Sequence, residues 1–195
     1  MEIIIHRRNT IQDLISTPSK YGVEIDIRSE KHNLIINHDP FTEGENFEEW
    51  IKHYTHGTLI LNVKEEGLEE KLIEILNRHK ISNFFFLDQS FPFLYKVSKS
   101  GESRIATRFS EYESIESVLA LKNMVTWVWI DFFTKFPLTK ELNTILKIND
   151  FKLCLVSPEL QGYSPNQVES LKSNIFQQGI AIDAVCTKFP EIWTL

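Results

Sequence analysis

The sequence Val23-Glu24-Ile25-Asp26-Ile27 alternates apolar and acidic residues, a pattern typical of a β-strand. Side chains along a strand point alternately to opposite faces of its sheet, so the three apolar residues share one face and the two acids share the other. The apolar face suits packing beneath helices. Two neighbouring carboxylates on an inward face repel each other, and a bound cation would offset that repulsion. The alternative is a solvated sheet edge, on which both acids would face water.

Short β-branched or aromatic runs alternate with longer amphipathic runs along the rest of the chain, which indicates βα units around a parallel sheet. The predicted strands are residues 3–6, 23–27, 58–63, 83–87, 104–109, 126–131, 152–156 and 182–187. The predicted helices are residues 11–16, 47–54, 68–79, 93–99, 115–122, 140–148 and 166–178, each with apolar residues three or four apart. Residues 34–37 follow the second strand too closely for a helix to intervene, so we expect an antiparallel return.

Eight strands with intervening helices favour a small (β/α)8 TIM barrel with short loops, because closure leaves no edge strand exposed. The chain has 195 residues, which predicts a single domain spanning residues 1–195. A doubly wound open sheet is the alternative fold.

The amino-acid composition and the net charge indicate which partners and which cellular location to expect. The net charge of −6 and the lack of a basic stripe argue against a nucleic-acid partner. The two cysteines, Cys154 and Cys186, lie in apolar runs, so we expect reduced core thiols and a cytoplasmic protein. We expect neither a transmembrane segment nor a secretory signal, since no apolar run approaches the ~20 residues of a membrane span. Four Trp and fourteen Phe allow an exposed apolar patch and a homodimer.

Several polar residues fall where predicted strands end, which is where barrel active sites lie. His6 closes the first strand, and Asn62 and Lys64 share one face of the third. Arg108 closes the fifth strand, and a guanidinium there suits phosphate recognition. Ordinary structural roles compete with these: His6 as a hydrogen-bonded core residue and Lys64 as a surface lysine. Three further acids at strand ends could equally cap the following helices: Asp88, Asp131 and Glu159.

The order of short motifs resembles the glycerophosphodiester phosphodiesterase family, which shares a barrel fold with phosphatidylinositol-specific phospholipase C. The resemblance is carried by His6-Arg7, Asn9-Thr10, Glu24-Ile25-Asp26, Ile36-Asn37-His38-Asp39, Asn62-Val63-Lys64 and the closing Thr187-Lys188-Phe189-Pro190. It spans the whole chain, and the first 40 residues carry most of its specificity. Each motif alone is weak, whereas their order and strand context together are specific.

The resemblance implies a phosphoric diester hydrolase that uses a divalent metal ion, Mg²⁺ or Ca²⁺. It implies that His6 and His38 form the acid/base pair and that Arg7 and Lys64 contact phosphate oxygens. Its metal ligands would be Glu24, Asp26 and Asn62. The substrate would be a small-molecule, lipid head-group or glycan phosphodiester.

Three departures from the family pattern qualify this reading. Asn62 stands where the family has a third metal-binding glutamate, so we expect weaker metal binding, a different metal preference or reduced activity. Arg8 replaces the glycine after His-Arg, and the loop after His38-Asp39 is short, which suggests a more open mouth. A catalytically weak or inactive relative that binds substrate is therefore the second hypothesis. An unrelated barrel enzyme using Lys64 as a Schiff-base amine is the third.

Overall fold

A computed structural model describes residues 1–194, and its main-chain contacts divide the chain into two compact units. Residues 5–101 form one unit, called here the first unit. Residues 1–4 and the chain from residue 102 onward form the other, called the second unit. Both units are of α/β type, which confirms the predicted class. The assignment of the whole chain to one domain stays a prediction.

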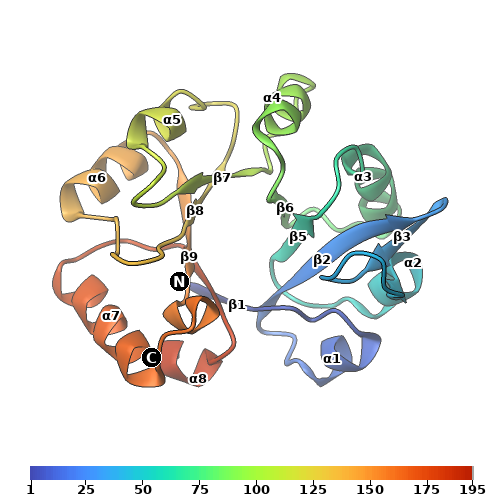
Figure 1. The fold of residues 1–195 in the computed structure, drawn as a ribbon, viewed down its shortest axis with the longest axis horizontal. Coiled ribbons are helices and arrows are strands. Elements are labelled where there is room, and N and C mark those ends of the chain that lie inside the picture. Colours follow the sequence, from blue (N-terminus) through green and yellow to red (C-terminus); the bar gives the residue numbers. More distant parts are fainter. Residues whose placement is uncertain (195) are drawn as a thin grey trace. The chain divides into compact units, whose positions relative to one another are not determined.

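The sheet of the first unit is centred on β2, a long strand drawn in blue in Figure 1. Its strands are β2 (Gly22–Glu30), β3 (Asn33–Ile36), β4 (Glu45–Asn46), β5 (Leu59–Val63) and β6 (Phe84–Leu87), in the order β4-β3-β2-β5-β6. β3 runs antiparallel to β2, whereas β5 and β6 run parallel to it. The register sets Asp26 opposite Asn62, which brings two predicted site residues together.

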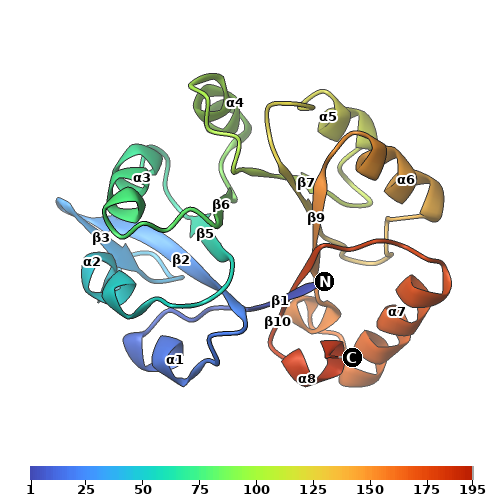
Figure 2. The same cartoon turned by 180° about the vertical axis from the view of Figure 1, so that it is seen from behind.

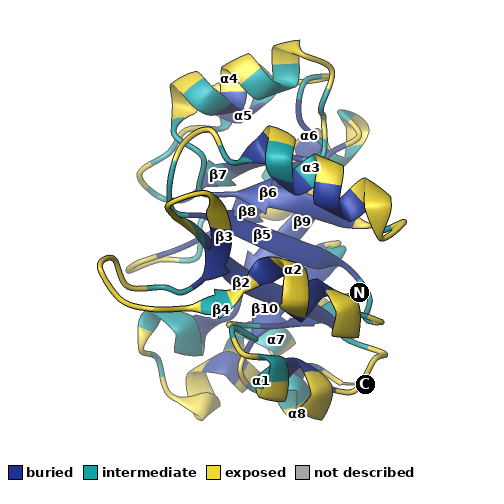
Figure 3. Cartoon of the chain, turned by 90° about the vertical axis from the view of Figure 1, so that its right-hand side faces the viewer, coloured by how far each residue is buried: buried dark blue, intermediate teal, exposed yellow. Residues whose placement is uncertain are grey.

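Each helix of the first unit has both buried and exposed residues, as Figure 3 shows for α3. They are α1 (Ile11–Ser16), α2 (Phe47–Trp50), the 3-10 helix η1 (Ile51–His53), α3 (Glu69–Arg78) and α4 (Phe91–Lys99). Thr10 caps α1 by accepting a hydrogen bond from the Asp13 amide at 3.0 Å. The buried residues of α3 include Leu72 and Leu76, four apart, as the amphipathic pattern predicts.

The second unit contains the remaining strands and helices (Figure 2). Its strands are β1 (Glu2–Ile5, whose last residue belongs to the first unit), β7 (Ala106–Phe109), β8 (Trp127–Ile130), β9 (Lys152–Val156) and β10 (Ala184–Thr187), in the order β1-β10-β9-β8-β7. Its helices are α5 (Ile115–Leu119), α6 (Lys140–Ile148), the 3-10 helix η2 (Pro158–Gln161), α7 (Pro165–Gln177) and α8 (Pro190–Trp193). The pairs β7–β8, β8–β9 and β9–β10 are all parallel.

All eight predicted strands and the antiparallel return are found within a few residues of their predicted ranges, and α1, α6 and β9 match theirs. The prediction missed β4, η2 and α8, which are too short to show a period. The prediction that Asp88, Asp131 and Glu159 cap the following helices is wrong. The N-cap residues of α4, α6 and η2 are Ser90, Thr139 and Ser157. Both cysteines are buried and neither forms a disulfide in the described chain. Within residues 1–194, no helix is long and apolar enough to cross a membrane.

Candidate active site

Glu24 and Asp26 lie side by side on β2 with 1% and 0% of their surface exposed. β2 is flanked by β3 on one side and β5 on the other, so it is an interior strand of its sheet. The solvated-edge reading is therefore wrong. Burying two carboxylates at such short spacing is costly unless nearby donors or cations offset their charge.

Glu24 is surrounded by polar groups from two separate segments, residues 6–7 and Asn62. Its Oε1 accepts a hydrogen bond from Nδ2 of Asn62 at 2.9 Å, and its Oε2 accepts one from the backbone N–H of Arg7 at 2.8 Å. Nε2 of His6 lies 3.8 Å from Oε2. The backbone of Arg7 has φ 52°, in the left-handed region, which costs residues other than glycine about 1–2 kcal/mol. In this conformation its N–H donates to Glu24.

Asp26 is held by a second set of groups. Its Oδ2 accepts from Nδ2 of Asn9 at 2.8 Å and lies 3.5 Å from Nε of Arg7. Its Oδ1 lies 3.2 Å from the ammonium of Lys64. Oδ1 of Asn9 in turn accepts from the backbone N–H of Asp26 at 3.1 Å, so Asn9 fixes this aspartate at two points.

Burial and the neighbouring charge of Asp26 raise the pKa of Glu24 to about 7, from 4.5. Hydrogen bonds from Asn62 and Arg7, with the charge of Lys64, oppose that rise in the pKa only in part. Glu24 thus holds its proton more tightly than an ordinary glutamate. A cation beside these acids would stabilise its charged form.

Asn62 supplies the observation that bears on a metal. Its side-chain oxygen is buried and has no hydrogen-bond partner among the described residues. Together with the carboxylates of Glu24 and Asp26, this oxygen gives a donor set that suits a hard cation. No group of three His, Cys, Asp or Glu residues capable of holding a metal occurs in the described chain, so an ion bound here would have to take a neutral amide as its third ligand. The residues fit a divalent ion with one negative charge fewer than three carboxylates would give.

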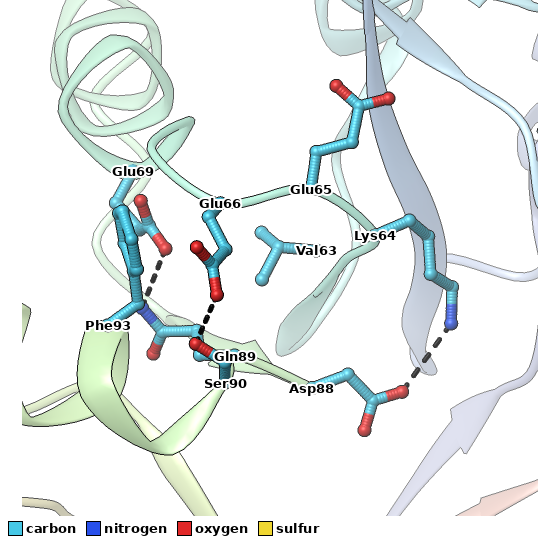
Figure 4. A pocket seen from close by; sticks show the side chains of 9 residues that line it. All are labelled: Val63, Lys64, Glu65, Glu66, Glu69, Asp88, Gln89, Ser90 and Phe93. Carbon is cyan, nitrogen blue, oxygen red and sulfur yellow. Dashed lines mark hydrogen bonds and ion pairs between the residues drawn. The ribbon is translucent and has the colours of Figure 1, made fainter.

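The ammonium of Lys64 lies between two acids. It is 3.2 Å from Oδ1 of Asp26 and 3.4 Å from Oδ2 of Asp88, and Figure 4 shows the second of these contacts. Asp88 follows β6 with φ 64°, and its ion pair with Lys64 makes it part of this cluster. The surface-lysine reading of Lys64 is wrong, since its side chain is only 17% exposed. An ion-paired ammonium suits phosphate binding and does not suit the neutral amine of a Schiff base.

A cavity of about 330 Å³ opens beside Lys64, at the carboxyl ends of β5 and β6 (Figure 4). Glu66 accepts a hydrogen bond from the Ser90 hydroxyl, and the buried Glu69 accepts one from Nε2 of Gln89 at 2.7 Å. The cavity is lined by Val63, Lys64, Glu65, Glu66, Glu69, Asp88, Gln89, Ser90 and Phe93. It provides space next to the lysine that we predicted to bind phosphate.

His38 follows β3, and its Nδ1 lies 2.8 Å from Oδ1 of Asp39. The hydrogen bond from His38 is the main cause that lowers the pKa of Asp39; desolvation opposes it, and the charges of His38, Arg7 and Arg28 lower the pKa further. An ionised Asp39 orients the imidazole through Nδ1 and leaves Nε2 for chemistry. The charge of Arg7 therefore acts on both Asp26 and the His38–Asp39 pair.

Arg108 belongs to the second unit, in β7. Its Nη1 donates to Oδ2 of the buried Asp131 at 2.6 Å, and Oδ1 of Asp131 accepts from Nε2 of Gln161 at 2.7 Å. This network fixes the guanidinium on its own unit. The phosphate role of Arg108 stays a prediction.

Two further residues were not assigned roles from the sequence. Asn9 lies outside the strand pattern, and only the fold reveals its two hydrogen bonds to Asp26. Arg28 shares the face of β2 that carries Glu24 and Asp26, and its guanidinium donates to the His38 carbonyl oxygen at 3.0 and 3.2 Å. The period-two alternation could have identified Arg28, had the strand been extended to its full length.

No protein-family model matches the chain, and no curated protein matches it. Several solved structures do match the chain. A candidate glycerophosphodiester phosphodiesterase from Galdieria sulphuraria is 15% identical, with 97% of this chain and 94% of that chain covered at a TM-score of 0.73. A glycerophosphodiester phosphodiesterase from Agrobacterium tumefaciens is 11% identical, with 99% and 97% covered at 0.72. One from Parabacteroides distasonis is 14% identical, with 96% and 82% covered at 0.65. The chain therefore has the fold of the glycerophosphodiester phosphodiesterases, as its sequence motifs predicted.

Proposed function

We propose that this chain is a metal-dependent phosphodiesterase, with His6 and His38 as its general acid and base. The observation that carries the proposal is the contact of His6 with Glu24, in a buried cluster that also holds Asp26 and Lys64. The shared fold with glycerophosphodiester phosphodiesterases supports this chemistry over other reactions of α/β proteins. The proposed fold is a complete (β/α)8 barrel, supported by the βα alternation in each unit.

The proposed reaction begins with an anionic phosphodiester whose oxygens contact Lys64 and Arg7. These cations offset the charge that builds on the phosphoryl oxygens as the nucleophile attacks. One imidazole removes the proton from water, or from a neighbouring substrate hydroxyl, which would give a cyclic phosphate. The other imidazole protonates the leaving alkoxide. Asp39 holds His38 in the orientation and tautomer that present Nε2.

Glu24, Asp26 and Asn62 are the residues that would hold Mg²⁺ or Ca²⁺. The ion would supply Lewis-acid stabilisation of the phosphoryl oxygens. The unsatisfied buried oxygen of Asn62 and the raised pKa of Glu24 support this assignment. With only two carboxylates, we expect the ion to bind more weakly than at a site with three.

The proposed substrate is a glycerophosphodiester or a related lipid head-group or glycan phosphodiester. The cavity beside Lys64 offers room for one of its alcohol groups. Association into a homodimer and a cytoplasmic location remain predictions from the sequence.

Asn62 also favours a second candidate function, that of a relative that binds phosphodiesters without hydrolysing them. Incubation with bis-(p-nitrophenyl) phosphate and a panel of glycerophosphodiesters, with Mg²⁺, Ca²⁺ or chelator, separates the two. We expect turnover that chelator removes. Binding of the same compounds without turnover under any metal would favour the second function.

A further inference from the structure

Arg28 lies two residues beyond Asp26 on the same face of β2, with only 17% of its side chain exposed. Neither the motif resemblance nor the proposed chemistry gives it a role. A guanidinium so little exposed needs partners that offset its desolvation. Its partners connect two segments that the proposed reaction uses.

One partner is the main chain of His38. The β2–β3 pairing ends near Ile27 opposite Ile36, and the Asn37 amide donates to the Asp26 carbonyl at 3.0 Å. At the next residue, Nε and Nη2 of Arg28 donate to the His38 carbonyl oxygen at 3.2 and 3.0 Å. The side chain of Arg28 therefore fixes the backbone where His38 leaves the sheet.

The other partner is Glu65, the residue after Lys64. Its Oε1 lies 3.7 Å from Nη1 of Arg28. Its Oε2 accepts hydrogen bonds from the amide and hydroxyl of Ser29, at 3.1 and 2.5 Å. Figure 4 shows that the side chains of Lys64 and Glu65 leave their loop in different directions. Glu65 thus connects its own loop, which also carries Lys64, with the side chain of Arg28. Lys64 itself contacts Asp26.

We infer that Arg28, held by Glu65, is a positioning residue that sets the main chain of His38, and so its imidazole, relative to Lys64. The inference rests on the proposed function, in which these two residues act on one phosphodiester. The planar guanidinium has a fixed fork of donors, which suits a carbonyl and a carboxylate together. The competing reading is that Arg28 only stabilises the β2–β3 hairpin.

The kinetic test compares Arg28→Gln with Arg78→Gln, whose exposed guanidinium lies 3.4 Å from Glu48. In Arg28→Gln we expect kcat to fall at least about tenfold and KM to change less than about twofold, since misplacing a reacting group slows the chemical step. Methylguanidine should restore part of kcat in Arg28→Ala. Glu65→Gln should lower kcat less, and adding it to Arg28→Gln should cause no further loss. An unchanged kcat in Arg28→Gln, with only a lower melting temperature, would overturn the inference.

A second experiment does not depend on turnover, so it tests this inference independently of the proposed function. Protein labelled with ¹⁵N-histidine gives imidazole signals for His38 and for the remote His79. We expect Arg28→Gln to shift the His38 signals and leave those of His79 in place. If the His38 signals shift but the protein has no turnover, the positioning role of Arg28 is supported and the proposed reaction is contradicted. Unchanged His38 signals would overturn the positioning role whatever the activity.

Discussion

The side-chain amide of Asn62 donates to Oε1 of Glu24 at 2.9 Å, while the oxygen of the same amide is buried with no hydrogen-bond partner among the described residues. A carboxylate in place of this amide would add one negative charge beside Glu24 and Asp26. We therefore expect Asn62→Glu to bind Mg²⁺ or Ca²⁺ at least about tenfold more tightly, measured by calorimetry, as ligand charge sets the affinity for hard cations. Asn77→Glu places the same charge on an exposed helix position and should leave the affinity unchanged. Equal affinities for wild type and Asn62→Glu would contradict the proposed ligand set.

The raised pKa of Glu24 predicts how stability depends on pH. Because its pKa is about 7 in the folded chain and near 4.5 when unfolded, the folded state retains the proton more strongly between these values. Stability contributed by Glu24 is therefore lost as pH rises from about 4.5 to 7, by on the order of 3 kcal/mol. Urea unfolding in chelator at several pH values should show this loss in wild type and not in Glu24→Gln. The control Glu70→Gln, on an exposed position, should follow wild type. A parallel pH profile for Glu24→Gln and wild type would contradict the assignment.

Removal of the Lys64 ammonium should weaken both turnover and phosphate binding. In Lys64→Ala we expect kcat/KM for a phosphodiester to fall at least about 100-fold, since a cation on the phosphoryl oxygens is worth several kcal/mol in the transition state. Inhibition by inorganic phosphate should weaken in parallel. Lys52→Ala is the matched control, because its exposed ammonium pairs with Glu49 at 2.7 Å, away from the proposed site. If inorganic phosphate inhibited Lys64→Ala as strongly as wild type, Lys64 would not bind phosphate. Its role would then be to pair with Asp26 and Asp88.

Asn9 is expected to matter for stability through its two hydrogen bonds to Asp26. Asn9→Ala removes one bond to a buried carboxylate and one to its backbone N–H, which together should cost about 3 kcal/mol. Urea unfolding measures this loss, and Asn77→Ala on the exposed face of α3 provides the baseline. A cost within 0.5 kcal/mol of that baseline, about the ordinary range of surface substitutions, would mean that other donors hold Asp26 adequately.

The period-two pattern of residues 23–27 correctly predicted a strand with both acids on one face, since alternation is a local property of the chain. Helices α1 and α6 were predicted as observed because their apolar spacing is also local. The two-residue strand β4 has no period to detect. The contacts of Asn9 and Arg28 join segments that are distant in sequence, so side-chain spacing alone could not reveal them. The same limit explains the error at Asp88, which pairs with Lys64 instead of capping a helix.

The most direct test of the proposed chemistry is phosphodiester turnover in His6→Gln and His38→Gln, measured beside His79→Gln. Glutamine keeps a polar side chain of similar size but cannot exchange a proton near neutral pH. General acid or base catalysis contributes about 10²–10⁴ in rate, so each of the first two variants should lose at least about 100-fold in kcat while His79→Gln matches wild type. Wild-type turnover in either His6→Gln or His38→Gln would contradict the account.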